Sequence, residues 1–387
     1  MLKRVVKRMN DVLIANTGLC RGREPEYKYF RQYANITLMG YKVPGKEAER
    51  RFEDLPIIYP NIRPIFLLDP IQKLRGVYSV TSIASYVNID SIVMKNDIIV
   101  TQDPNYFSYQ VTKSAVDSKR KVVNVNFENV LKNSIFLSPL YRRATNYILH
   151  NSDIFIPQTR KALEFLTKNG VPIDRTKMIY PGVDTSLFSP SIDVEERQHN
   201  NSNNKTKFLF VGTLTHTKGV LELVNAFLKL HDKEPNTELI LVGSGYLKSS
   251  LSQYKNNECI IHLENLDANQ MADLYRSSDI FVMLSRARKI GPYTVGEEQL
   301  SFALLEALSS GLPIITTDSG SIKEVVGEDN ITVNANNEQE IIDKMYTLYN
   351  DPKVRKRIGE KNRKRAISLF DARKQSKEFM QYVLNEK

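Results

Sequence analysis

Between residues 207 and 317, short apolar segments alternate regularly with amphipathic segments. The apolar segments are rich in Val, Ile, Leu and Phe, which is typical of buried strands, and the segments between them carry apolar residues at helical spacing. Strands that alternate with helices predict a doubly wound, mostly parallel sheet with right-handed crossovers. The predicted strands cover residues 207–212, 238–243, 260–263, 279–284 and 312–317.

The first half of the chain shows the same alternation less regularly. A chain of 387 residues is too long for one hydrophobic core, so two domains are expected. Asn, Ser and charged residues replace the apolar pattern at 189–206, which predicts a linker between a domain over 1–188 and a second over 207–370. The strands predicted in the first half cover residues 11–16, 35–40, 96–101, 121–126 and 153–157.

The composition is that of an ordinary globular protein. Apolar residues make up 41% of the chain, and no apolar run approaches the roughly 18 residues of a membrane-spanning helix. Near the amino terminus, charged and polar residues at positions 7, 8, 10 and 11 interrupt the apolar stretch before a signal peptide can form, so a cytoplasmic protein is expected. Cys20 and Cys259 lie far apart without metal-ligand spacing, which indicates unpaired, reduced thiols.

The net charge of +10 favours a polyanionic partner. Nucleic acid, an anionic membrane surface and a phosphate-bearing substrate all fit, and charge alone does not choose among them. No nucleic-acid-binding module is recognisable in the sequence, so nucleic-acid binding is the remote alternative. The basic amino terminus (Lys3, Arg4, Lys7 and Arg8) and residues 139–149 suit peripheral contact with anionic lipid at the inner membrane face.

Two glycine-containing turns follow predicted strands of the second half. Because ligands bind beyond the carboxyl ends of strands in open parallel sheets, both turns are candidate ligand contacts. The first, residues 212–219, contains Gly212, Thr213 and Lys218 and suits a phosphate. The second, with Gly243 and Gly245, has room for a base or a ribose. Each turn taken alone is equally explained as an ordinary connection between strand and helix.

An acidic pair, Glu298 and Glu306, brackets the predicted start of a helix. If the spacing is helical throughout, the carboxylates lie about 12 Å apart, too far to chelate one metal ion or to act as a close hydrolase pair. That separation suits a nucleotide sugar, with Glu298 near the sugar and Glu306 accepting hydrogen bonds from the ribose. Backbone N–H groups near Ser301 and Phe302 would meet the diphosphate. The alternative is that Glu306 caps or pairs on a solvated helix face.

These motifs resemble glycosyltransferase family 4, a group of retaining enzymes with the two-domain GT-B architecture. The family signature, E-x7-E followed by E-A-[ML]-[AS]-x-G-x-P-[VI]-[IV], is present from Glu298 to Ile315. The resemblance implies an α/β fold of two Rossmann-like, doubly wound domains that face a central cleft, with the last helix, residues 371–387, packed back on the first domain. The similarity continues through residues 153–190, 211–219, 241–245 and 274–285.

The resemblance also implies an activity: transfer of a hexose, with retention, from a nucleotide sugar to a glycan, a lipid-linked or another hydroxyl acceptor. A UDP- or GDP-sugar would be a co-substrate, with no permanently bound cofactor, and no metal is expected because no Asp-x-Asp motif is visible. Glu298 would stabilise charge on the sugar, and Lys218 would stabilise the leaving diphosphate. The expected nucleotide-sugar contacts are Gly212, Thr213, Lys218, Gly243, Gly245, Leu266, Leu300, Ser301, Phe302 and Glu306.

The second half departs from the family pattern at several positions. The family often has Arg where Thr213 stands, which leaves Lys218 as the expected phosphate cation. Ser301 and Ser321 replace glycines, and both changes are small. An insert between Ser285 and Glu298 carries three cations, which either reach a phosphate or, as the simpler interpretation, are solvated. These cations are Arg286, Arg288 and Lys289.

The first half lacks a histidine that many members of the family place after the strand corresponding to residues 121–126. No His precedes His150, so Asn126 or Glu128 contacts the sugar instead, or that role is absent. The missing histidine keeps a GT-B nucleotide-sugar epimerase or phosphorylase as the second hypothesis, although the E-x7-E segment favours transfer.

Overall fold

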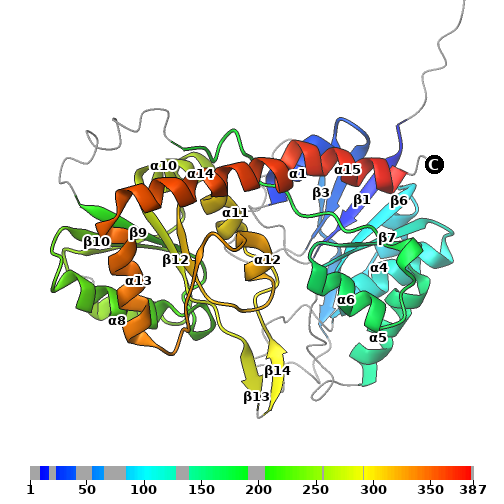
Figure 1. Cartoon of the computed structure of the whole chain (residues 1–387). Coiled ribbons are helices and arrows are strands. Elements are labelled where there is room, and N and C mark those ends of the chain that lie inside the picture. Colours follow the sequence, from blue (N-terminus) through cyan, green and yellow to red (C-terminus); the bar gives the residue numbers. More distant parts are fainter. Residues whose placement is uncertain are drawn as a thin grey trace, which may run out of the picture. The chain divides into compact units, whose positions relative to one another are not determined.

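The computed structural model describes residues 9–16, 23–40, 55–64, 84–127, 139–190, 205–254, 257–290 and 292–384. Glu128, Cys20 and the four basic residues at the amino terminus lie outside these ranges. The chain divides into two compact units, Met1–Pro181 with Arg373–Lys387, and Gly182–Ala372. Each unit is an α/β domain built on a six-stranded sheet (Figure 1).

The first unit is built on a parallel sheet with the strand order β3-β2-β1-β6-β7-β8. Its central strands β1, β6 and β7 are buried at every position but one each, as expected for strands covered on both faces. The five strands predicted in this half are confirmed. The strands are β1 (Asp11–Ala15), β2 (Asn35–Met39), β3 (Ile57–Ile58), β6 (Ile98–Gln102), β7 (Lys121–Asn126) and β8 (Ile154–Pro157), with a separate antiparallel pair of β4 (Asn61–Pro64) and β5 (Ala84–Val87).

Helices cover both faces of this sheet. They are α1 (Glu24–Phe30), α3 (Ile89–Val93), α4 (Tyr106–Asp117), α5 (Pro139–Asn151), α6 (Arg160–Lys168) and α15 (Ala372–Leu384). On one face α1 and α15 close an apolar core, in which the rings of Phe30 and Phe379 stack with centroids 4.7 Å apart. On the other face α3 and α4 bury Ile92 and Val111. The last helix of the described chain is therefore part of the core of the first unit.

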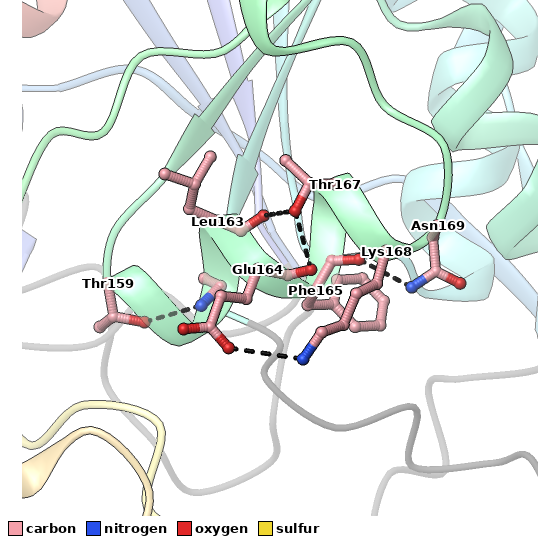
Figure 2. Close-up of polar contacts among 8 residues, drawn as sticks. Thr159, Leu163, Glu164, Phe165, Thr167, Lys168 and Asn169 are labelled. Carbon is pink, nitrogen blue, oxygen red and sulfur yellow. Dashed lines mark hydrogen bonds and ion pairs between the residues drawn. The ribbon is translucent and has the colours of Figure 1, made fainter.

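The turn after β8 shows how local sequence fixes a helix at the carboxyl edge of this sheet (Figure 2). The Thr159 hydroxyl accepts a hydrogen bond from the Ala162 N–H at 3.1 Å and so caps the start of α6. At the other end, the Asn169 side chain donates to the Phe165 carbonyl at 2.7 Å. Side chains at its two ends therefore define where α6 begins and ends.

The second unit contains a parallel sheet with the strand order β11-β10-β9-β12-β15-β16. The strands are β9 (Thr206–Val211), β10 (Thr237–Val242), β11 (Ile260–Leu263), β12 (Ile280–Met283), β15 (Ile314–Thr316) and β16 (Ile331–Thr332). The five predicted strands are confirmed, and β16 adds a sixth. The insert forms an antiparallel hairpin of β13 (Arg288–Ile290) and β14 (Tyr293–Gly296), which projects from the rest of the unit (Figure 1).

The helices of the second unit are α8 (Val220–His231), α9 (Lys248–Leu251), α10 (Ala268–Ser277), α11 (Phe302–Ser309), α12 (Ile322–Val326), α13 (Glu338–Asn350) and α14 (Pro352–Leu369). Figure 1 shows α8 and α13 on one side of the sheet and α10, α11 and α14 on the other. A capping box between Asp267 and Gln270 begins α10. Because the strands are parallel, the loops after β9, β10, β12 and β15 gather at one edge, the carboxyl edge of the second sheet.

Candidate active site

Two glycine turns at this carboxyl edge pack backbone against backbone. Residues 212–219, between β9 and α8, are called the phosphate turn below. A Cβ on Gly243 would lie 2.0 Å from the Gly212 carbonyl oxygen, and a Cβ on Gly245 would lie 2.3 Å from the Leu214 carbonyl oxygen. Contact between the turns therefore requires these glycines, whereas the sequence suggested that they leave room for a base.

A tyrosine and a glycine fix the shape of the phosphate turn. The Tyr246 hydroxyl accepts a hydrogen bond from the His216 N–H at 3.0 Å. Gly219 follows the short 3-10 helix η4 (His216–Lys218) in the left-handed region, with φ 66°. A Cβ at this glycine would lie 2.3 Å from the Leu284 carbonyl oxygen, so only glycine fits. The lysine of the turn thus stands on a backbone that is held at both ends.

Lys218 and Glu298 meet at this edge although they are 80 residues apart in the sequence. The Lys218 Nζ donates to Glu298 Oε2 at 2.5 Å, and the Ser285 hydroxyl donates to the same oxygen at 2.8 Å. The two charged side chains are only 21% and 10% exposed, so water screens their attraction less than it would on the open surface. Two of the predicted catalytic side chains therefore lie in direct contact.

The loop after β15 holds Glu298 through its backbone. The Ser321 N–H donates to the Glu298 carbonyl at 2.9 Å. Gly320 has φ 62°, and a Cβ there would lie 1.8 Å from the same carbonyl oxygen. The hydroxyls of Ser319 and Ser321 are buried without a hydrogen-bond partner within the described ranges. Glycine at position 320 is thus a condition for the position of Glu298.

Helix α11 begins at Phe302, so Glu298 stands in the loop before it. The spacing of the acidic pair is therefore not helical throughout, and the separation expected from the helical rise does not apply. Ser301 is the N-cap but makes no side-chain capping bond, so its own side chain does not close the helix start. Glu306 is 4% exposed, which makes the alternative of a carboxylate on a solvated face wrong.

The remaining predicted contacts lie in loops of the same unit. Thr213 is exposed in the phosphate turn, while Leu300, before α11, and Leu266, between β11 and α10, are half-buried. Ser285 and Tyr246 were not among the predicted residues. The position of Ser285 just after β12 could have pointed to it, but the role of Tyr246 depends on the contact between two turns and leaves no signal in the sequence.

In the first unit, Asn126 ends β7 at the carboxyl edge of that sheet. Its side chain is fully buried, and neither polar atom of its carboxamide has a hydrogen-bond partner among the described residues. The Gln158 N–H donates to the Asn126 carbonyl at 2.9 Å. The Gln158 side chain accepts a bond from the buried Arg23, which also pairs with Glu26 at 2.7 Å. A buried amide without partners is rare, which makes Asn126 a candidate for contact with a ligand or an ordered water.

Three further features bear on the expected chemistry. In the part of the chain that the structure describes, no His, Cys, Asp and Glu side chains gather in threes as a metal site requires. Among the same residues, no helix combines the length and apolar character needed to cross a bilayer. Cys259 is a buried free thiol, and burial raises its pKa, so it stays protonated at neutral pH and is a poor nucleophile.

Two Rossmann-like α/β units on parallel sheets define the GT-B fold class. The same architecture occurs in the solved structure of HepE from Anabaena in complex with UDP-glucose. The superposition covers 96% of this chain and 98% of that chain, with a TM-score of 0.74 and 16% sequence identity. A likeness at this identity establishes the fold alone.

Residues 191–365 match the family model described as "Glycosyl transferases group 1". The matched residues lie within the second unit. Sulfoquinovosyl transferase SQD2 of Arabidopsis thaliana is 25% identical over 213 residues, which are 53% of this chain and 39% of that protein. D-inositol 3-phosphate glycosyltransferase of Pseudarthrobacter chlorophenolicus is 25% identical over 210 residues, 51% of this chain and 48% of that protein. The chain thus spans less than half the length of these two relatives.

Proposed function

We propose that the protein is a retaining hexosyltransferase of the family 4 type, which moves a sugar from a UDP- or GDP-sugar to a hydroxyl acceptor. The contact between Lys218 and Glu298 carries this proposal, because it places a cation and a carboxylate together at the edge of a glycosyltransferase group 1 domain. Both relatives are named for glycosyl transfer, and the HepE structure contains UDP-glucose, which supports a nucleotide-sugar donor.

The proposed mechanism starts from the charge that develops on the leaving nucleoside diphosphate. Stabilising such charge is usually the largest electrostatic contribution of an active site. Lys218 supplies the cation, and the backbone N–H groups near Ser301 and Phe302 supply further donors. Glu298 pairs with Lys218, so an arriving diphosphate displaces the carboxylate from the lysine and takes its place as the partner of the ammonium group. Glu298 then faces the sugar, where it orients the ring and stabilises its positive charge.

The acceptor is proposed to bind in the first unit, where either Asn126 or Glu128 would contact a sugar; Glu128 lies outside the described residues. A hydroxyl group both donates and accepts, so sugar hydroxyls satisfy the nitrogen and the oxygen of the Asn126 carboxamide. The nearby Arg23 is already paired with Glu26, which favours a neutral, hydroxyl-bearing group over an anion at this edge. A glycan or the sugar of a lipid-linked acceptor has this chemistry.

A GT-B nucleotide-sugar epimerase or phosphorylase is the competing proposal, and nucleic-acid binding is the remote one. Product analysis with a labelled nucleotide sugar separates the enzymatic classes. A transferase forms a labelled glycoside that requires the acceptor, an epimerase forms an isomerised sugar without it, and a phosphorylase requires inorganic phosphate. Isomerisation in the absence of acceptor would replace the proposed activity.

A thermal-stability screen with UDP-, GDP- and ADP-sugars tests the proposed donor. One of them is expected to stabilise the folded protein by about 2.7 kcal/mol at a concentration one hundred times its Kd, because it binds only the folded state. The matched controls are the free sugars and the nucleosides, which lack the diphosphate and are expected to shift the melting temperature little. If no nucleotide sugar raises the melting temperature above these controls, the donor site is wrongly assigned.

We further propose that the protein is cytoplasmic and contacts anionic membrane at its inner face. The exposed side of α14 supports this contact, because five cations lie there with Glu360 as the only acid of the helix. We call this set the basic face. Among the residues that the structure describes, Lys361 alone of the set forms an ion pair, with Asp329 at 2.5 Å. The basic face consists of Lys353, Lys356, Arg357, Lys361 and Lys364.

Co-sedimentation with phosphatidylglycerol vesicles tests the basic face. Each basic residue near an anionic surface contributes about 1 kcal/mol, so changing four of them to Gln is expected to weaken binding about 100-fold or more. The four are Lys353, Lys356, Arg357 and Lys364. A control variant changes four exposed lysines elsewhere to Gln, namely Lys113, Lys119, Lys168 and Lys233. Equal losses in both variants, or equal binding to phosphatidylcholine vesicles, would contradict a specific surface.

A further inference from the structure

Arg286, at the foot of the β13–β14 hairpin, contacts the start of α8, the loop after β16 and the phosphate turn at the carboxyl edge of the second sheet. Its Nη2 contacts Glu222 Oε1 at 2.7 Å, in the first turn of α8, and donates to the Ala335 carbonyl at 3.0 Å, in the loop after β16. Its backbone N–H donates to the Thr217 carbonyl at 2.8 Å, inside the phosphate turn. The side chains of Arg286 and Glu222 are each 29% exposed, so the interpretation as a solvated charge is wrong for Arg286.

These bonds lie one residue away from the catalytic contacts along both segments. Thr217, which accepts from the Arg286 backbone, precedes Lys218, and Ser285, which donates to Glu298, precedes Arg286. The two segments are therefore joined twice, once through the backbone beside the lysine and once through the Lys218–Glu298–Ser285 contacts. The guanidinium attaches the segment of Arg286 to the start of α8 through Glu222.

The pair between Arg286 and Glu222 uses only one atom of each group. Arg286 Nε and Glu222 Oε2 are both buried and have no hydrogen-bond partner in the described part of the chain. The planar guanidinium still serves two acceptors in fixed directions, Glu222 and the Ala335 carbonyl. A lysine at this position would keep the charge opposite Glu222 but would reach both acceptors less well.

We propose that Arg286 is a positioning residue for donor cleavage: its guanidinium fixes its own segment to the start of α8 and to the loop after β16, and this segment in turn holds the phosphate turn and Lys218 in place. This inference rests on the proposed function. Electrostatic stabilisation by Lys218 depends on its placement relative to the leaving diphosphate, and a misplacement of about 1 Å costs up to 100-fold in rate. Losing the guanidinium releases the segment of Arg286 from α8 and from the loop after β16. Because the backbone of this segment holds the Thr217 carbonyl, the phosphate turn becomes less fixed and Lys218 samples positions away from the phosphate.

The test measures release of UDP or GDP by hydrolysis of whichever nucleotide sugar gives the largest thermal stabilisation. Arg286→Met is expected to lower kcat about 10-fold to 100-fold, because it removes both side-chain contacts. The KM for the donor is expected to change less than about threefold, because charge on the diphosphate is greatest in the transition state. Arg286→Lys should recover much of the loss. The matched control is Lys229→Met, which breaks an ion pair with Glu338 at the other end of α8 and should leave kcat unchanged.

The decisive measurement repeats Arg286→Met in the Lys218→Ala background. If Arg286 acts through Lys218, the second change adds little to the first, whereas independent effects multiply. A multiplied loss overturns the inference, and so does a normal kcat in Arg286→Met when Lys218→Ala is inactive. Normal turnover in Lys218→Ala itself would instead remove the proposed function. Should Arg286→Met not fold, Glu222→Gln weakens the same pair and takes its place in the cycle.

Discussion

Replacing Lys218 with Ala is expected to lower kcat/KM about 10²-fold to 10³-fold, the usual effect of losing one preorganised donor to developing negative charge. The side chain is 21% exposed, and among the described residues its polar contact is with Glu298, so its removal should leave the fold intact. Glu298 retains the Ser285 hydroxyl as a donor and should keep its place. Activity, rather than stability, is therefore the property that changes.

Initial rates of purified Lys218→Ala, with the melting temperature of the same sample, check this expectation. Glu298→Ala provides the comparison, because it leaves the lysine in place but removes the carboxylate that faces the sugar. We expect this variant to lose a similar fraction of its activity and to bind the nucleoside diphosphate at least as well as the unaltered protein, since the lysine has lost its internal counter-ion. Near-normal turnover in both variants would remove the assignment of this site.

Gly320→Ala is expected to damage both stability and activity. The added Cβ would lie 1.8 Å from the Glu298 carbonyl oxygen, so the backbone of one of the two loops must move. The left-handed conformation at φ 62° adds about 1–2 kcal/mol of strain for alanine, and overpacking adds about 1–3 kcal/mol. Because Glu298 is displaced in the process, kcat should fall by about 100-fold.

Denaturant unfolding and initial rates together test the Gly320 prediction. Gly170→Ala is the control, since Gly170 has φ 85° but an added Cβ there meets nothing within 4 Å. The control isolates backbone strain from the contact with Glu298. A loss of stability in Gly320→Ala no greater than that in Gly170→Ala would show that the contact with Glu298 does not constrain the loop.

Much of the second sheet could be predicted because its parallel strands are buried on both faces and therefore form continuous apolar runs. The strand β16 escaped prediction because Ile331–Thr332 is too short to show any periodicity. The hairpin β13–β14 escaped because its three- and four-residue strands lie in an insert that was interpreted through its charges alone.

The candidate site was predicted in part, for a related reason. Lys218 and Glu298 each follow a local pattern, a turn after a strand and an acid before a helix, so both were selected although their contact spans 80 residues. Arg286 was misjudged because its partner Glu222 lies in another element, and no local pattern marks such a pair. The roles of Gly243 and Gly245 were likewise set by the neighbouring turn rather than by their own segment.

The position of α15 also constrains the order in which the two units can fold. This helix supplies Phe379, Met380 and Val383 to the core of the first unit, yet it follows the whole of the second unit in the chain. On the ribosome the second unit is contiguous and has all its residues once position 372 has emerged, while the first waits with one apolar face uncovered. Nascent chains of this protein therefore expose that face from the synthesis of the first unit's strands until α15 has emerged, and chaperones and proteases have access to it throughout that interval.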